Sequence, residues 1–474
     1  MGIQNDQAAS TALMTMMDGT HIAAMSSIIG DASRVLTAPT VVEQLSRDFY
    51  WYSPVLRKQL DGKVADVAVQ PLTAEEVQGI LRYCYAKEIP VTTRGAGTGN
   101  YGQAVPLHAG VILDLIRMDK IEEIQPTGVA VCQPGARLGA LENEARRKGW
   151  ELRCYPSTIV KASVGGFLGG GSGGIGSVAH GGLRDFGTVR AIEVVTMEAE
   201  PRILTHEGEA VHEILHAWGT NGIITRIWLA LTPGIDWSQC AVAFEGFDAA
   251  FDFGERIATS EQWIKRLVTT FEWPIPSFFT PVRQYAPEGK SLVFFLVTTW
   301  QLGTLESAAK KAGGEVTYSG SYVGLRTRPL LSDYTWNHTT LWAMKSDEAY
   351  TYLQCGFDPD SVREQLRRLK EHFGNEILFH MEFMKNGTGR VIPGALPVVY
   401  FTSEARLNEM IDFCRSIGVY VANPHVNNVE GGGRYREDNV QLLAKRRYDP
   451  RGLLNPGKMI SFHRENATTG AKNS

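Results

Sequence analysis

The distribution of glycine constrains this chain more than any other feature of its sequence. One glycine-rich run reads Arg94-Gly-Ala-Gly-Thr-Gly-Asn-Tyr-Gly102, and a longer one, from Gly165 to Gly187, holds eleven glycines in twenty-three residues. A third segment, Trp218-Gly-Thr-Asn-Gly-Ile-Ile-Thr225, follows them. Because glycine tolerates positive φ and carries no side chain, successive backbone N–H groups in such runs can converge on an anion. The three segments together predict a backbone cradle for a diphosphate.

The first run also fits the G-x-G-x-x-G formula of a Rossmann dinucleotide site, but its context differs. A Rossmann fingerprint opens a helix, whereas Gln103-Ala-Val-Pro106 follows here and leads into another strand. We therefore expect a loop between two strands whose own N–H groups hold the phosphates. A flexible Gly/Ser linker explains the second run less well, because apolar residues such as Phe167 and Ile175 are interleaved with its glycines.

Length and composition exclude several other classes of protein. At 474 residues the chain exceeds the size at which one hydrophobic core stops growing, so two packed units are expected. The net charge of -4 and the sequence pI of about 6.3 argue against nucleic-acid binding. Six scattered cysteines without Cys-x-x-Cys spacing indicate neither a zinc site nor a disulfide framework. With no signal peptide and no apolar run of about 18 residues, the prediction is a soluble cytoplasmic protein without a membrane span.

Periodicity and turn residues divide the chain into two α+β parts. In the first part, Thr73 and Glu76 form a capping box that begins a helix over 74–87. The other elements predicted in this part are strands over 111–116, 128–135, 189–197 and 223–231 and a helix over 136–148. Thr232-Pro-Gly234 punctuates the last of these strands, which places a domain boundary near residue 234.

The second part, residues 235–420, has the pattern of an antiparallel sheet with helices. Its predicted elements are strands over 293–299 and 398–402 and helices over 360–373 and 403–417. Residues 421–462 read as loop-rich, with an ordered turn over 448–458 because Pro450 and Pro456 stop a helix. Residues 1–40 are predicted to be a short helical arm or partly disordered, and 463–474 a loose tail.

Several short motifs carry a resemblance to a known family. They are Arg94-Gly-Ala-Gly-Thr98 with Gly102, Gln133-Pro-Gly135, Ala162-Ser-Val-Gly-Gly166 with Gly173-Gly174, Gly219-Thr-Asn-Gly-Ile-Ile-Thr225, and Leu454-Asn-Pro-Gly-Lys458 after Asp449-Pro450. In this order they resemble the FAD-linked oxidases of the vanillyl-alcohol oxidase and p-cresol methylhydroxylase type. The resemblance is nearest to the glycolate oxidase and D-lactate dehydrogenase-like branch.

This resemblance implies an α+β fold with FAD between a two-part FAD-binding domain of the p-cresol methylhydroxylase type and a cap domain with an antiparallel sheet. The FAD-binding domain is then 41–234, the cap 235–420, and residues 421–462 return to the FAD-binding domain. The residues that the resemblance places against FAD are Arg94, Gly95, Ala96, Gly97, Thr98, Gly102, Pro134, Gly135, Ser163, Gly165, Gly166, Gly173, Gly222, Ile224 and Asn455.

Two departures from the family pattern refine the expectation. Thr98 stands where some members tether the flavin through a histidine, and Ile159 where others use a cysteine, so non-covalent FAD is predicted; a tether through a cap histidine is the alternative. Metal-assisted members carry paired histidines in the cap. The corresponding stretches here, 379–389 and 423–428, lack those pairs, so no bound metal is predicted.

Oxidation of an alcohol by a flavin needs a base that titrates near the working pH, and histidine suits that role. His425 lies in the segment that matches the family's catalytic element and is the first candidate; His338 and His380 are further candidates. Glu382 is a candidate for polar contact with the substrate. Arg326 and Arg328 are candidates for a bidentate clamp on a substrate carboxylate.

The predicted function is FAD-dependent oxidation of a small 2-hydroxy acid or alcohol by hydride transfer to flavin N5. An aromatic-rich cap favours a phenolic alcohol as the alternative substrate; its aromatic residues are Trp273, Phe278, Phe279, Trp336 and Trp342. Another alternative is an electron-transferring subunit of a larger oxidase complex; the possible assemblies are a homodimer or such a complex. An NADPH-dependent reductase is disfavoured by the missing Rossmann helix. The electron acceptor is not specified by the sequence.

Overall fold

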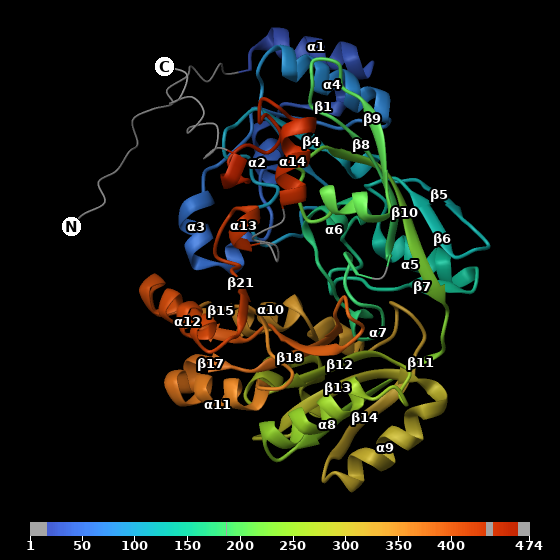
Figure 1. Ribbon diagram of the computed structural model, residues 1–474, viewed down its shortest axis with the longest axis vertical. Helices are drawn as coiled ribbons and strands as arrows, with labels where there is room; N and C mark the ends of the chain where they lie inside the picture. Colours follow the sequence, from blue (N-terminus) through green and yellow to red (C-terminus); the bar gives the residue numbers. More distant parts are fainter. Residues whose placement is uncertain (1–16, 186, 433–438, 463–474) are drawn as a thin grey trace.

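The computed structural model describes residues 17–185, 187–432 and 439–462. They form two units, one above the other in Figure 1, with the C-terminal helices among the N-terminal elements of the upper unit. We call these the N-terminal unit and the cap. The arrangement is the mixed α+β fold expected from the sequence. Among the described helices none is long and apolar enough to cross a membrane.

A small sheet begins the N-terminal unit. Its strand order is β1 (Val35–Leu36), β2 (Val67–Val69), β4 (Val111–Asp114) and β3 (Val91–Arg94), and the last three strands are parallel. The crossover helix α4 (Ala74–Ala86) begins as predicted, because Thr73 Oγ1 accepts a hydrogen bond from Glu76 N at 3.2 Å. The apolar residues Val77, Ile80, Leu81 and Cys84 bury one face of α4 at helical spacing. The first glycine run follows β3 directly.

Residues 17–40 are more than the arm expected from the sequence. Helix α1 (Gly19–Ile29) packs against α4, where His21 Nδ1 lies 2.8 Å from Tyr83 Oη, and β1 pairs with β2. The helix fits the short helical arm that the sequence offered, whereas its packing was not predicted because the short apolar pattern of α1 is completed only by contact with α4. The part of the predicted arm before residue 17 and the predicted tail 463–474 lie outside the described residues.

An antiparallel sheet completes the N-terminal unit. Its strands run β5 (Ile121–Ile124), β6 (Val129–Cys132), β10 (Ile223–Pro233), β8 (Val189–Val195) and β9 (Ile203–Glu207), and β7 (Trp150–Leu152) pairs with the end of β10. Its helices are α5 (Leu138–Arg147), α6 (Val164–Gly170) and α7 (Ser177–His180). The second glycine run is therefore partly helical. Ser163 caps α6 through Gly166 N at 3.3 Å, which the glycine content concealed.

The cap is built on an eight-stranded sheet whose pairings are antiparallel. Its order is β14 (Glu315–Tyr322), β11 (Trp237–Phe244), β13 (Ser291–Thr298), β12 (Lys265–Phe271), β18 (His380–Lys385), β19 (Val391–Ala395), β16 (Gln354–Gly356) and β21 (Tyr420–Ala422). The sheet changes between Pro233 and Trp237, where the sequence places a boundary. The strand over 398–402 appears as β20 (Val398–Tyr400) in a separate three-stranded sheet with β15 (Tyr350–Tyr352) and β17 (Ile377–Leu378).

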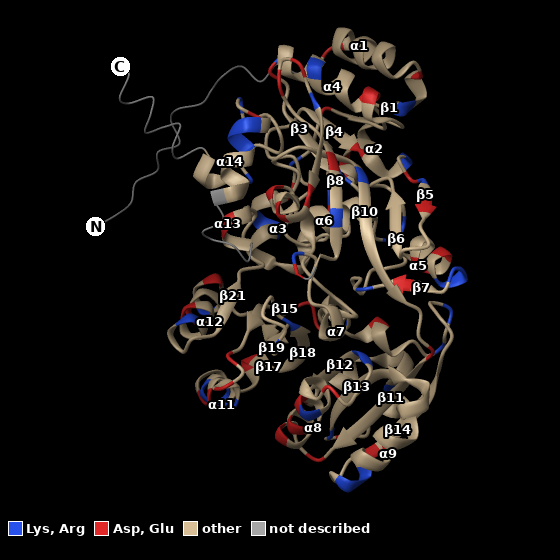
Figure 2. Ribbon diagram, turned by 45° about the vertical axis from the view of Figure 1, so that its right-hand side comes forward, with Lys and Arg blue, Asp and Glu red and all other residues tan. Residues whose placement is uncertain are grey.

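Four helices share one core with the large sheet, and a fifth lies elsewhere. The four are α8 (Phe247–Thr259), α9 (Leu302–Lys311), α11 (Val362–Phe373) and α12 (Glu404–Ser416). Strand β18 shows the resulting alternation, since Met381 and Phe383 enter this core while Glu382 and Met384 face the other way. Figure 2 shows acidic and basic segments interspersed over α8, α9 and α11. The fifth helix, α10 (Asn337–Ser346), lies on the side of the cap next to the N-terminal unit (Figure 1).

The end of the chain returns to the N-terminal unit through helices that the sequence reading missed. They are α13 (Val429–Gly432) and α14 (Asn439–Tyr448). The predicted turn follows α14, and Asn455 N donates to Val91 O at 2.7 Å beside β3. Helix α14 was not predicted, because Pro450 and Pro456 exclude a helix only after its last residue, Tyr448.

One buried ion-pair cluster joins the two units. Arg266 of β12 lies 3.3 Å from Glu142 of α5 and 3.2 Å from Glu151 of β7, and its Nη2 also donates to Leu152 O at 2.9 Å. All three charged side chains are at most 2% exposed. The guanidinium also lies over the ring of Tyr155. Arg146 of α5 also pairs with both carboxylates, so one cation from the cap and one from the N-terminal unit balance them.

Candidate active site

A cavity of about 1040 Å³ lies between the two units. This volume is at the upper end of the range for ligand pockets, which suits a large ligand with a smaller one beside it. The N-terminal unit contributes segments from the three glycine-containing regions. The cap contributes residues of β16, β18 and β19, and one face of α10. Aromatic residues of the segment 49–52 complete the wall.

The first glycine loop presents backbone donors to this cavity. The N–H groups of Gly97, Thr98, Gly99 and Asn100 have no hydrogen-bond partner among the described residues. Gly97 has a φ of 65°, which a residue with a side chain rarely adopts. Ala96 N donates a hydrogen bond to Ser163 Oγ at 3.2 Å. Ser163, the N-cap residue of helix α6, therefore joins the two glycine runs. Four unpaired donors in one loop match the acceptor oxygens of a phosphate.

Close packing leaves no room for side chains behind this wall. A Cβ on Gly165 would lie 2.5 Å from Pro134 Cβ and 2.9 Å from Pro134 Cα. A Cβ on Gly219, whose φ is 68°, would lie 2.1 Å from Thr93 Cγ2. Glycine at these positions lets α6 and the third segment approach the neighbouring chain.

The segment before Gly219 is held in a strained conformation. His216 and Trp218 have φ values of 57° and 54°, unusual for residues with side chains. His216 N donates to Leu168 O and Trp218 N donates to Gly169 O, both at 2.9 Å. His216 also lines the cavity. Sequence reasoning missed this histidine because nothing in its neighbourhood marks a positive φ.

A buried charge pair lies behind the first glycine loop. Asp48 accepts hydrogen bonds from Tyr50 N at 3.0 Å and Ala104 N at 3.2 Å, and burial raises the pKa of this carboxyl to about 6. Lys458 Nζ donates to Gly102 O at 2.7 Å, and burial lowers the pKa of this ammonium to about 7. Segments from both ends of the chain therefore hold the end of the loop.

Most of the predicted FAD contacts lie on the cavity wall. They are Arg94, Gly95, Ala96, Gly97, Thr98, Pro134, Ser163, Gly165, Gly166, Gly173, Gly222 and Ile224. Arg94 is committed to the protein, since its Nη1 donates to Arg47 O at 2.7 Å and also to Leu45 O. It therefore orients the loop.

Three of the predicted FAD contacts lie behind the wall. Gly102 is bound by Lys458, and a Cβ on Gly135 would lie 2.3 Å from Leu115 O. Asn455 Nδ2 donates to Gln103 O and Trp218 O, both at 2.8 Å. These three residues support the wall without lining it. The sequence motifs do not distinguish residues that line the cavity from residues behind it.

His425, the first candidate for the base, does not line the cavity. Its ring is buried, with Nδ1 2.7 Å from Ser53 Oγ and Nε2 2.9 Å from Tyr352 O. Burial lowers its pKa to about 4. With both ring nitrogens occupied by the protein, this geometry opposes a role as base. His425 instead ties the C-terminal segment to the chain at residues 53 and 352.

His380 and Glu382 form a buried pair of which only the carboxylate lines the cavity. His380 Nε2 lies 3.0 Å from Glu382 Oε1, and the ring stacks on Phe271. Glu382 accepts hydrogen bonds from Trp336 N at 2.8 Å and Thr269 Oγ1 at 2.7 Å. The pair therefore holds the start of α10, and the predicted catalytic role of His380 is opposed by its position behind the wall.

His338 does line the cavity, from the first turn of α10. Its Nδ1 lies 3.2 Å from the carbonyl oxygen of Asp333. A carbonyl can only accept, so the proton is on Nδ1 and Nε2 keeps its lone pair. Burial lowers the pKa of His338 to about 4, which leaves the ring neutral at neutral pH.

The predicted carboxylate clamp is not assembled. Arg326 and Arg328 are exposed and lie outside the cavity wall. Arg328 Nη1 donates to Thr327 O at 2.6 Å. In the described part of the chain, the cap cation on the wall is Lys345, which sequence reasoning missed. The available signal was its spacing of seven residues from His338, which places both on one face of a helix.

The aromatic residues named from the sequence separate into two groups. Phe279 is fully buried in a core cluster with Phe278 packed against it, and Trp273 lies outside the wall as well. Trp336 and Trp342 line the cavity.

Comparison with known proteins identifies relatives of the chain and of the fold. Residues 65–204 match the family described as FAD binding domain. The chain is 25% identical to a D-lactate dehydrogenase of Archaeoglobus fulgidus over 439 residues, covering 83% of this chain and 91% of that protein. It is 35% identical to a glycolate oxidase subunit of Escherichia coli over 174 residues, covering 35% and 34%. The structure of an alkyldihydroxyacetonephosphate synthase matches with a TM-score of 0.70 at 15% identity, covering 93% of this chain and 86% of that one, which shows the shared fold.

Proposed function

Because this chain is an FAD-linked oxidoreductase of the oxidase family with a p-cresol methylhydroxylase-type FAD-binding domain, we propose that it oxidises the CH–OH group of a 2-hydroxy acid or alcohol. The relatives named above act on lactate or glycolate according to their names, and this supports the substrate class. The observation that carries the proposal is one cavity with phosphate-binding geometry on one wall and a neutral histidine on the other.

The N-terminal wall fits FAD. Its unpaired N–H groups at residues 97–100 suit the diphosphate, and the glycines at 165 and 219 allow close approach of the backbone. Bound there, FAD supplies the acceptor for the hydride that leaves the substrate carbon. The chain itself contributes the position of the substrate and the removal of its hydroxyl proton.

His338 is the base in this proposal. Its Nε2 lone pair accepts the hydroxyl proton, while the Asp333 carbonyl fixes the ring orientation. Glu382 holds Trp336 N, which precedes α10, and so fixes the helix that carries His338. Because the pKa of His338 lies near 4, the base form is present above that pH. We expect the rate of flavin reduction to vary little between pH 5 and 8 and to fall as the pH approaches 4.

The test is anaerobic flavin reduction by a panel of 2-hydroxy acids and alcohols, followed by bleaching of the flavin band. His338→Gln should retain FAD and lower the reduction rate by about 10²-fold to 10⁴-fold. His372→Gln is the matched control, because His372 is exposed on α11 and pairs with Glu409. An unchanged rate in His338→Gln would remove it as the base. Failure of the whole panel to bleach the wild type would refute the proposed function.

Attachment of FAD is proposed to be non-covalent, since Thr98 and Ile159 occupy the positions where relatives carry tethering residues. Gel filtration in denaturant should move the yellow colour into the small-molecule fractions. Colour that stays with the polypeptide would instead favour a histidine tether, with His338 the cap histidine on the wall.

The oligomeric state and the electron acceptor can be tested together. We propose that the chain turns over on its own with a soluble dye acceptor, as a homodimer. Turnover that requires a further protein would favour the alternative of an oxidase-complex subunit.

A further inference from the structure

One face of α10 combines three kinds of group along the cavity. Asn337 and His338 begin it, Leu341 and Trp342 follow after one turn, and Lys345 completes the second turn. The rise from 338 to 345 is about 10 Å, and helical side chains lean toward the N-terminus, so the lysine points back toward the histidine. Burial is the main cause of the lowered pKa of His338, and the positive charge of Lys345 adds to it.

Lys345 is available to a ligand. Its Nζ lies 4.0 Å from the centroid of the Trp342 ring, and no ion pair joins it to a carboxylate of the described residues. Of the other basic residues on the wall, Arg94 is committed to backbone carbonyls and Lys161 belongs to the N-terminal unit. Asp333, Asp358 and Glu382 lie on the same cap wall. One unpaired cation beside three acids suits a single carboxylate and disfavours a dicarboxylate.

An apolar and aromatic surface adjoins this face of α10, formed by residues of both units. Phe49, Trp51, Trp336 and Leu341 pack against one cluster that contains Tyr52, and all five line the cavity. A ligand as small as lactate would leave this apolar surface exposed to water. An aromatic ring would cover it and gain the attraction between ring edges and faces.

Two buried polar atoms on this wall have no partner in the described part of the chain. They are the indole nitrogen Nε1 of Trp336 and the amide oxygen Oδ1 of Asn337. Leaving a buried donor or acceptor unpaired destabilises a protein, so such atoms are normally satisfied by a ligand or water. A 2-hydroxy acid offers the acceptor and the donor that they lack.

We propose that the substrate is a monocarboxylic 2-hydroxy acid that bears an aromatic ring, with its carboxylate at Lys345 and its ring against Trp51, Trp336 and Leu341. This inference rests on the proposed function and specifies its substrate. It adds two specificity determinants, Lys345 for the acid and the aromatic cluster for the side chain. His338 Nε2 and Asn337 Oδ1 are then the acceptors near the reacting hydroxyl.

The experiment compares four probes by anaerobic flavin reduction, each hydroxy acid in both enantiomers: lactate, 3-phenyllactate, 2-hydroxyglutarate and 2-phenylethanol. We expect 3-phenyllactate to exceed lactate in kcat/KM by at least about tenfold, in line with the discrimination available from apolar burial. It should also exceed 2-hydroxyglutarate and the alcohol. Equal or better use of lactate, or of the dicarboxylate, would overturn the inference while leaving the proposed function intact. Better use of 2-phenylethanol would overturn the carboxylate assignment. If none of the probes reduced the flavin, the proposed function itself would fail.

Variants locate the two determinants. Lys345→Gln should raise KM for 3-phenyllactate about tenfold to a hundredfold and change kcat little, because the lost contact is a charge-assisted one. Lys345→Arg should recover most of the loss. Lys311→Gln is the matched control, an exposed lysine in the last turn of α9 and outside the cavity.

A binding readout separates specificity from turnover and from misfolding. Phenylacetate, which has no hydroxyl to oxidise, should perturb the flavin spectrum of the wild type, and its Kd should rise with Lys345→Gln and with Trp336→Leu. Unchanged Kd values in both variants, with flavin content equal to wild type, would refute the site. If a variant loses its flavin, the test is instead the salt dependence of phenylacetate binding to the wild type. An ion pair between the carboxylate and Lys345 must weaken as the ionic strength rises, so a Kd that does not rise with salt would refute the site.

Discussion

The two walls of the cavity are built by different means. The N-terminal wall presents backbone donors in glycine loops. Its charged residues Arg94, Asp48 and Lys458 form hydrogen bonds within the protein that hold the first glycine loop in place. The cap wall uses side chains on a regular helix, α10, and on strand β18. A backbone wall suits a ligand that is always the same, whereas a side-chain wall can change with the substrate at little cost to the fold. Four experiments test whether the two walls are built independently.

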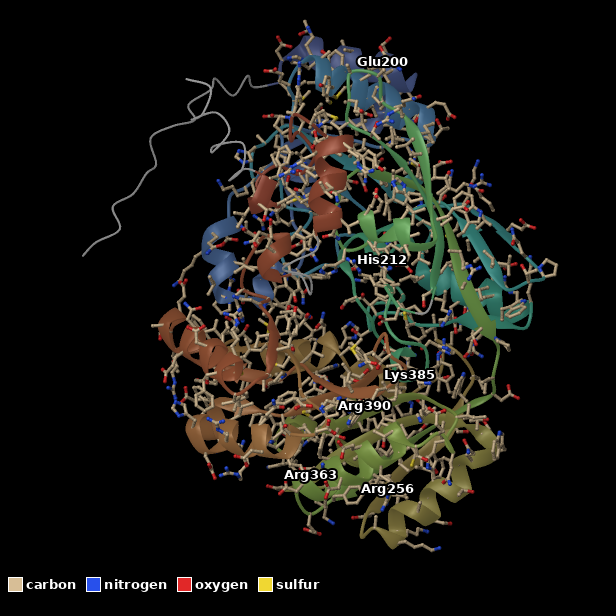
Figure 3. All side chains as sticks on the ribbon, viewed as in Figure 1. Glu200, His212, Arg256, Arg363, Lys385 and Arg390 are labelled. Atoms are coloured by element: carbon tan, nitrogen blue, oxygen red, sulfur yellow. The ribbon has the colours of Figure 1, made fainter. Side chains whose placement is uncertain are left out.

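The largest effect is expected where the two units meet. Arg266→Met removes the buried cation that pairs with Glu142 and Glu151 and leaves the two carboxylates to Arg146 alone, so the free energy of unfolding should fall by about 3 to 5 kcal/mol. Urea unfolding measures it. The control is Arg363→Met on the outer edge of the cap (Figure 3), which removes exposed pairs with Asp252 and Glu255 and should cost at most about 1 kcal/mol. Equal losses in the two variants would mean that the cluster does not join the units.

The N-terminal wall should tolerate no added side chain. Gly165→Ala places a Cβ within 3 Å of Pro134, and overpacking of this kind costs about 1 to 3 kcal/mol. FAD affinity, measured by quenching of flavin fluorescence, should fall about tenfold to a hundredfold. Gly303→Ala is the control, because no atom lies within 4 Å of its added Cβ. If FAD affinity survived in Gly165→Ala, close backbone packing would not be what shapes this wall.

Acid should destabilise the chain through its buried histidines. The pKa of His425 is about 4 in the folded state and near 6.5 in the unfolded chain, so protonation favours unfolding as the pH falls from 6.5 to 4. This one residue should lower the free energy of unfolding by about 2 kcal/mol between pH 7 and pH 5. His425→Gln should lower stability at pH 7 and reduce that pH dependence by the same amount. A pH dependence identical to wild type would contradict the buried neutral state of His425.

The smallest expected change tests the independence of the walls. Lys345→Gln should leave FAD affinity within about twofold of wild type, because the lysine lies on the cap wall and the diphosphate donors lie on the other. A large loss of FAD would show that α10 contributes to the cofactor site and that the division into two walls is wrong.

The success of the sequence reading follows the same division. The glycine runs and the helices over 74–87 and 136–148 were predicted because each depends on neighbours a few residues away. The clamp at Arg326 and Arg328 was proposed from guanidinium chemistry and the base at His425 from its position in a motif, and all three residues lie off the cavity. A motif does not specify the direction in which a side chain points. Lys345 and the aromatic residues 49–52 line one cavity although they lie almost three hundred residues apart in the sequence, which no local pattern reveals.

The sequence alone determined that a backbone cradle exists, since glycine readily adopts φ values such as that of Gly97 and can approach a neighbour as closely as Gly165 approaches Pro134. It also determined the class of protein, through motifs whose order survives at low identity. The tertiary structure decided which titratable groups reach the cavity. Burial and hydrogen bonding commit His425, His380 and Arg94 to the fold, while His338 and Lys345 face the cavity. That choice depends on the packing of α10 against the distant strand β18, and therefore on contacts that form only when the chain folds.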